Sequence, residues 1–259
     1  MLNWTAFTEA QILLFALIFL RMIAFVVASA FFGSESIPVS VKVLLSLVLS
    51  VMLFPIVRIS NVDYLVISNE IISLAIRELV VGLSIGFLTR IFFFVVSMVG
   101  DLIAMSLGLS AGQMFNPLLG TTGNAMESFY STLGTLVFLA INGHHILIRA
   151  IFESYSLVPV SSLSLNIGPF GEIATFGSTA LILTIKMCAP VLVTILLVNL
   201  AMGILGRAVP QINVLVTSIP VTIMIGMTVV FICLPLMIME MNGLVEMTAS
   251  QVFKFMKAL

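Results

Sequence analysis

The sequence predicts an all-α, polytopic membrane protein built of apolar helical hairpins. Hydrophobic residues make up 61% of its 259 residues and charged residues 8%, whereas about a quarter of the residues in a soluble domain are charged. The mean hydropathy is +1.29. The stretch Met187–Met239 holds one charged residue, Arg207, among 53. A straight helix of that length would measure about 80 Å, against roughly 30 Å of bilayer hydrocarbon. The stretch therefore predicts two helices joined by a turn.

The turn is predicted where a charge, a helix-breaking proline and two amides gather between the two apolar halves. Proline cannot donate the N–H that would continue the helix. The turn candidates are Arg207, Pro210, Gln211 and Asn213.

Apolar runs and their interruptions predict the other elements. Val158–Gly177 is the longest predicted loop, Gly143-His144-His145 a polar turn, and Glu240–Leu259 a mixed tail. Gly82 and Gly86, four residues apart, predict close helix packing. The predicted helical runs are, in order, Ala10–Phe32, Val39–Ile59, Ile71–Thr89 with its continuation Ile91–Leu107, Phe129–Asn142, Ile146–Phe152, Met187–Leu205 and Val214–Met239.

Composition argues against several functional classes. The net charge is −1 and the pI near 6.1, without a run of Lys and Arg, so neither nucleic acid nor an anionic lipid surface is an expected partner. The N-terminus has no positively charged segment, which disfavours a cleaved signal peptide. Cys188 and Cys233 lack metal-ligand spacing, and we expect no metal or cofactor.

Charged residues fall inside or at the edge of the apolar runs. A charge at the centre of a lipid-facing helix costs about 2.5–3.5 kcal/mol. These residues therefore pair inside a helical bundle, belong to helices that do not lie in lipid as ordinary spans, or mark helix ends and extend to the interface. Arg77 and Glu78 project about 100° apart on a helix and need not pair with each other. The six are Arg21, Lys42, Arg77, Glu78, Asp101 and Lys186.

The uncharged, glycine-rich segment Gly108–Asn124 is a candidate constriction. Irregular backbone at membrane depth survives only where protein buries it or where it lines a water-filled cavity. An ordinary loop at the membrane boundary remains an equal alternative. The candidate pore-loop residues are Gly108, Ser110, Gly112, Gln113, Phe115, Asn116, Pro117 and Gly120.

Two other functions remain open on the residues alone. Gly108-Leu109-Ser110-Ala111-Gly112 matches the G-x-S-x-G pattern of hydrolases, and His144, His145 and Asp101 could complete an intramembrane serine protease. No strand precedes that serine, so we expect no catalytic residue. A small-solute transporter is the other alternative, although the sequence shows no internal repeat with paired broken helices.

An ordered set of short blocks runs along the chain. The blocks are Gly100-Asp101-Leu102-Ile103, Leu107-Gly108-Leu109-Ser110, Phe115-Asn116-Pro117, Asn142-Gly143-His144 and Asn199-Leu200-Ala201-Met202-Gly203, followed by Arg207, Pro210-Gln211 and Asn213. Together they resemble the FliR family, the export-gate membrane proteins of flagellar type III secretion; the injectisome gate proteins are relatives. The likeness covers essentially the whole chain, and Asn116 stands where some members carry Asp.

The resemblance implies a structural, non-enzymatic role in the bacterial inner membrane, at the flagellar basal body. Family members form a helical hetero-oligomeric pore with FliP and FliQ, with FlhB and FlhA as further partners, and unfolded flagellar subunits pass through it. It implies a FliP-like region at 1–177, including loop 108–124 as the plug of the closed pore, and a FliQ-like hairpin and tail at 178–259. Part of the gate would stand above the bilayer, where the charges would face partner proteins.

Topology is not settled by charge alone. Lys186, Lys254 and Lys257 flank one end of the last hairpin and Arg207 its turn, so the positive-inside rule would place the turn outside. The resemblance implies instead that the turn lies toward the cytoplasmic base of the gate, and we favour the resemblance.

Overall fold

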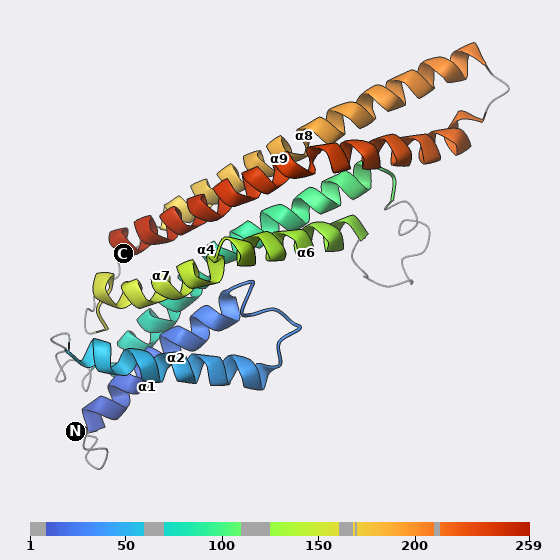
Figure 1. The fold of residues 1–259 in the computed structure, drawn as a ribbon. Coiled ribbons are helices and arrows are strands. Elements are labelled where there is room, and N and C mark those ends of the chain that lie inside the picture. Colours follow the sequence, from blue (N-terminus) through green and yellow to red (C-terminus); the bar gives the residue numbers. More distant parts are fainter. Residues whose placement is uncertain (1–8, 60–69, 110–124, 161–167, 169, 210–212) are drawn as a thin grey trace. The chain divides into compact units, whose positions relative to one another are not determined.

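The computed structural model describes residues 9–59, 70–109, 125–160, 168, 170–209 and 213–259, and in these ranges all regular structure is helical. Among these described residues, five helices are long and apolar enough to cross a membrane, and Ala125–Ala140 with Gly143–Leu157 could form a sixth, bent span. The predicted all-α, polytopic class is therefore confirmed. The helices are α1 (Glu9–Ala28), α2 (Val39–Ile59), α4 (Ile71–Ser106), α6 (Ala125–Ala140), α7 (Gly143–Leu157), α8 (Phe170–Ala208) and α9 (Val214–Ala258) (Figure 1).

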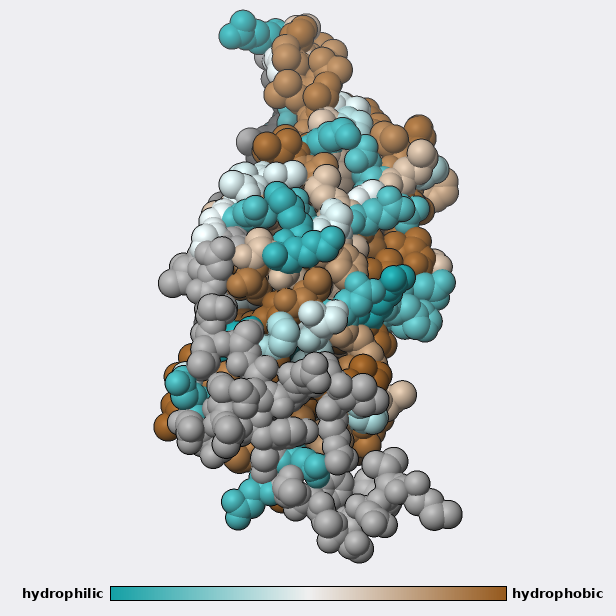
Figure 2. Space-filling model, turned by 90° about the vertical axis from the view of Figure 1, so that its left-hand side faces the viewer, coloured by the Kyte–Doolittle hydropathy of each residue, from teal (hydrophilic) through white to brown (hydrophobic). Residues whose placement is uncertain are grey.

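The chain divides into two compact units, and three helices contribute to both. Unit 1 comprises Met1–Ile91, Asn142–Phe176 and Glu246–Leu259, and unit 2 comprises Phe92–Ile141 and Gly177–Val245. Helices α4, α8 and α9 each begin in one unit and end in the other. Apolar side chains also reach the surface over wide areas (Figure 2), as expected of a membrane protein.

In unit 1, α1 and the first half of α4 approach each other closely along two glycines. A Cβ at Gly86 would lie 2.5 Å from the Cβ of Ala28, and a Cβ at Gly82 would lie 2.9 Å from the Cβ of Ala24. Both contacts are shorter than van der Waals distance, so only glycine fits. The close packing predicted from the two glycines is confirmed.

In unit 2, the second half of α4 packs against α6 in the same manner. A Cβ at Gly100 would meet the Cα of Glu127 at 2.7 Å, and Ser97 Oγ donates a hydrogen bond to Glu127 Oε1 at 3.0 Å. Helix α4 ends in a Schellman motif, with Gly108 at φ +77° and Leu109 N–H bonded to the carbonyl of Ala104 at 3.0 Å. The C-terminal end of α4 is thus capped directly before residues 110–124.

The last two helices form the predicted hairpin. Helix α8 ends at Ala208 and α9 begins at Val214, and Figure 1 shows them antiparallel. The carbonyl of Asn213 accepts the backbone N–H of Thr217 at 3.1 Å, as the residue before a helix does. Pro190, Pro220 and Pro235 lie inside these helices without ending them.

Some predicted boundaries were wrong. Helix α1 ends at Ala28, short of Phe32, whereas α8 begins at Phe170, inside the stretch predicted as the longest loop, and α9 continues through the predicted tail to Ala258. His144 and His145 belong to the first turn of α7. The break before α7 lies at Asn142, a non-glycine residue with φ 57°. Asparagine tolerates this left-handed conformation better than other residues with a Cβ.

Candidate functional site

The most constrained polar cluster of the described chain is an ion pair inside unit 1. Arg21 from α1 bonds Glu78 from α4 through two guanidinium nitrogens: Nε donates to Oε2, and Nη2 donates to Oε1 at 2.7 Å. Neither side chain has any exposed surface. Bidentate geometry is the strongest arrangement of these two groups, so the charges that would be costly in an apolar helix neutralise each other.

Helix α7 supplies the remaining partners of Arg21. Nη1 donates to Ser154 Oγ at 3.2 Å, and Nη2 also donates to the carbonyl of Val158 at 3.0 Å. The guanidinium carbon lies 4.2 Å from the centroid of the Tyr155 ring, within the range of a cation–π contact. The Tyr155 hydroxyl donates to the carbonyl of Ile18 at 3.1 Å. One arginine thus joins α1, α4 and the C-terminal end of α7.

Arg77 extends the cluster by one residue. Its Nη1 donates to the carbonyl of Pro159 at 2.9 Å and lies 3.9 Å from Glu78 Oε1, too far for a hydrogen bond. Two arginines and one glutamate leave an excess positive charge, which faces the carbonyl end of α7. Cations are favoured at that end of a helix dipole.

We call this cluster, Arg21, Arg77, Glu78, Ser154 and Tyr155, the arginine clamp. Burying an ion pair costs desolvation that its own attraction only roughly offsets, whereas removing one partner leaves an uncompensated buried charge. The clamp therefore specifies how three segments far apart in sequence meet. Its groups are held by one another, which suits a structural role better than proton transfer or nucleophilic attack.

The other predicted charges lie in different surroundings. Lys42 donates to the carbonyl of Gly33 at 2.9 Å, across the connection between α1 and α2. Asp101 is half-buried on α4 in unit 2. Lys186 pairs with Glu240 at 2.9 Å across the α8–α9 hairpin. For Arg21 and Glu78, the expectation that charges would face partner proteins is wrong, because they face each other.

Most predicted pore-loop and turn residues lie outside the described residues. Gly108 is described, as the C-terminal cap of α4. Arg207 is exposed in the last turn of α8 and Asn213 is exposed just before α9. Outside the described residues lie Ser110, Gly112, Gln113, Phe115, Asn116, Pro117, Gly120, Pro210 and Gln211.

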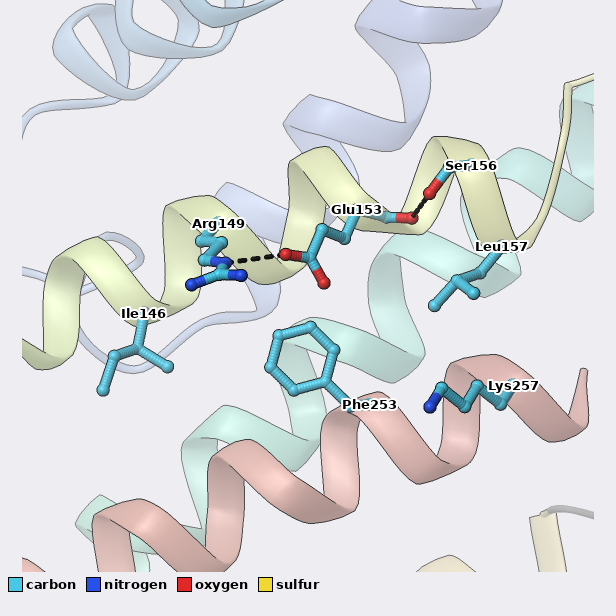
Figure 3. A pocket seen from close by; sticks show the side chains of 7 residues that line it. All are labelled: Ile146, Arg149, Glu153, Ser156, Leu157, Phe253 and Lys257. Carbon is cyan, nitrogen blue, oxygen red and sulfur yellow. Dashed lines mark hydrogen bonds and ion pairs between the residues drawn. The ribbon is translucent and has the colours of Figure 1, made fainter.

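Unit 1 also carries a surface cavity of about 480 Å³ between α7 and the end of α9. Figure 3 shows the Phe253 side chain extending from α9 toward α7. Arg149 Nε donates to Glu153 Oε1 at 2.6 Å at its edge. Three apolar side chains, one hydroxyl, a surface ion pair and one lysine provide no catalytic constellation in this cavity. The residues that line the cavity are Ile146, Arg149, Glu153, Ser156, Leu157, Phe253 and Lys257.

Comparison with known proteins assigns the family. The model of the family described as "Bacterial export proteins, family 1" matches residues 12–248. The chain belongs to this bacterial export family. It is 28% identical over 238 residues to "Flagellar biosynthetic protein FliR" of Aquifex aeolicus, covering 91% of each chain. The protein of the same name from Bacillus subtilis is 29% identical over 237 residues, 90% of this chain and 91% of the relative, and that of Escherichia coli is 26% identical over 217, or 84% and 82%.

Sequence reasoning missed the α7 half of the clamp in this export protein. Ser154 and Tyr155 occupy ordinary positions on a helix with one polar face, and Val158 and Pro159 contribute only carbonyl groups. No side-chain type marks a carbonyl acceptor in a sequence. The one signal was indirect: an arginine in the middle of the apolar α1 requires buried partners from somewhere in the fold.

Proposed function

We propose that this chain is a structural component of the flagellar type III protein export gate in the bacterial inner membrane. Together with FliP- and FliQ-like proteins it forms the pore through which unfolded flagellar subunits leave the cytoplasm. The family match over residues 12–248 carries this proposal. The relatives named flagellar biosynthetic protein FliR cover about nine-tenths of the chain, which supports the flagellar assignment.

The fold supports an assembly role over the alternatives. Helices α8 and α9 expose apolar side chains along most of their length, and such surface needs lipid or a partner helix. The arginine clamp stabilises unit 1 from within and leaves its outer face available for partners. The family assignment does not support a small-solute transporter or an intramembrane serine protease.

The finer roles belong to this proposal as well. Residues 178–259 act as the FliQ-like hairpin and tail, and 1–177 as the FliP-like region, with FlhB- and FlhA-like proteins as further partners. Gly108–Asn124, which contains no charged residue, plugs the closed pore, since an uncharged segment can occupy an apolar constriction without an unpaired ion. Arg207, Pro210, Gln211 and Asn213 form the closed end of the hairpin at the gate base.

Co-purification tests the assembly. The tagged chain would be expressed with and without the FliP- and FliQ-like proteins of its own organism, solubilised in mild detergent and sized by chromatography. The proposal predicts one discrete, larger complex containing all three proteins. The proposal would be contradicted if the tagged chain, still folded, eluted at the same size with and without the two proteins and neither of them co-purified with it.

A further inference from the structure

Two ion pairs join α8 to α9, and they have the same antiparallel register. Within unit 2, Lys186 Nζ of α8 lies 2.9 Å from Glu240 Oε1 of α9. Within unit 1, Lys254 Nζ of α9 lies 3.3 Å from Glu172 Oε2 of α8. The two members on α8 are 14 positions apart in the sequence, and the two on α9 are also 14 positions apart. The first pair is the one nearer the turn in the sequence.

Between the first pair and the turn the hairpin carries no charge. On α8, 20 uncharged residues separate Lys186 from Arg207, and on α9, 26 separate Asn213 from Glu240. Twenty helical residues span about 30 Å, which is the thickness of bilayer hydrocarbon. The whole of α8, with 39 residues, would be about 58 Å long. This is longer than the hydrocarbon is thick, so one end of the helix must lie outside it.

The surface of this charge-free part is suited to acyl chains. Thr194 Oγ1 donates to the carbonyl of Pro190 and Thr228 Oγ1 to that of Met224, each at 2.8 Å, so these hydroxyls need no outside partner. Asn199 is also exposed, and its amide is a polar exception on this otherwise apolar surface. Exposed apolar side chains along both helices include Leu196, Leu197, Leu200, Ile204, Phe231 and Ile232.

The Lys186–Glu240 pair is itself exposed, with 62% of the lysine and 31% of the glutamate side chain accessible. An exposed ion in hydrocarbon is costly, whereas one at the interface reaches water. We propose that the bilayer hydrocarbon ends at the Lys186–Glu240 pair and at the Arg207 turn, with acyl chains covering the hairpin between them. The parts of α8 and α9 on the far side of the pair lie outside the hydrocarbon. This placement does not depend on the export role.

Cysteine reactivity tests the boundary. In the full-length chain with Cys188 and Cys233 replaced by alanine, single cysteines would be introduced at Ile182 and Leu197, which are 65% and 60% exposed. The protein would be reconstituted in vesicles of phosphatidylethanolamine and phosphatidylglycerol and treated with N-ethylmaleimide. This reagent crosses membranes but needs a thiolate, which forms in water. Ile182→Cys should react, and Leu197→Cys should react at least roughly ten-fold more slowly. Equal reactivity of the two, fast or slow, would overturn the boundary.

A second measurement identifies what covers the protected surface. A fluorophore on each of these cysteines would be exposed to vesicles whose acyl chains are brominated, because bromine quenches only at contact. Quenching at position 197 without quenching at position 182 supports lipid contact. A protected but unquenched probe at position 197 would show that protein covers this face and would overturn the proposal. Ile232→Cys and Ser250→Cys form the corresponding pair on α9, inside and beyond the boundary, and must agree.

Discussion

Arg21 and Glu78 lie 57 residues apart in sequence, yet they form a bidentate ion pair with no solvent-accessible surface on either side chain. The pair fixes α1 against α4 and offers its remaining hydrogen-bond donors to the C-terminal end of α7. Because both charges are buried, the two residues depend on each other, and their mutants should behave as a coupled set.

Removing one member of the pair should be costly, and removing both should be less so. Arg21→Met leaves Glu78 buried without its cation, at an expected loss of about 3–5 kcal/mol of folding stability. Arg21→Met with Glu78→Met should recover a large part of that loss. Thermal unfolding in one fixed detergent compares Arg21→Met, Glu78→Met and the double variant with the unmodified chain. A double variant as unstable as the sum of the single ones would show that the two residues are not coupled.

Gly86→Leu should push α1 away from α4. A side chain there would meet the Cβ of Ala28, and overpacking of this kind costs about 1–3 kcal/mol. Gly203 of α8 is the matched control, because a Cβ added there meets no atom within 4 Å. Gly203→Leu should therefore leave stability unchanged or raise it, since leucine favours a helix by up to about 1 kcal/mol over glycine. Equal losses at both sites, measured by thermal unfolding, would mean that the α1–α4 contact is looser than described.

Charge reversal tests the register of the α8–α9 hairpin. Lys186→Glu places two carboxylates opposite each other and should destabilise the hairpin, whereas adding Glu240→Lys should restore the pair. For exposed ion pairs the coupling is about 0.2–1 kcal/mol, measurable in a double-mutant cycle by chemical unfolding. The Glu172 and Lys254 pair, 3.3 Å apart, provides an independent repeat. Zero coupling at both pairs would indicate that they do not contribute to the register.

Leakage tests the proposed plug. Replacing Gly112 and Gly120 with valine should loosen the seal of the closed pore, because β-branched residues restrict the backbone that glycine leaves free. The expected result is uptake of a small dye or ion conductance across the inner membrane, with the amount of assembled complex unchanged. Gly171→Val is the control, at a helical glycine with open space around it. If cells that assemble the variant with valine at Gly112 and Gly120 show no dye uptake and no conductance, the segment is a boundary loop and not a plug.

The hairpin was predictable from the sequence, whereas the arginine clamp was not. A charge, a proline and two amides lie between two apolar runs, and this pattern predicts two helices joined by a turn. Helix α8 ends and α9 begins at these residues. The partner of Arg21 could have been any buried carboxylate, because pairing across 57 residues depends on how helices pack. The carbonyls of Val158 and Pro159 carry no signal in a sequence.

Helix ends were the least predictable feature, for an equally physical reason. The residues from Glu240 to Leu259 are mixed in polarity, so the hydropathy of a membrane span ends near Met239. The helix nevertheless continues to Ala258, because an amphipathic helix packs on the described core through Val252, Phe255 and Met256. Hydropathy locates apolar spans and does not locate the ends of helices that extend beyond them.

Secretion by cells that lack this chain tests the central claim most directly. The gene would be deleted in the organism that carries it and restored on a plasmid, and flagellar subunits would be measured in the medium and in the cytoplasm. The account predicts that subunits accumulate inside the deletion strain and are absent from its medium, and that the plasmid restores their export. Normal export of flagellar subunits by the deletion strain would contradict it.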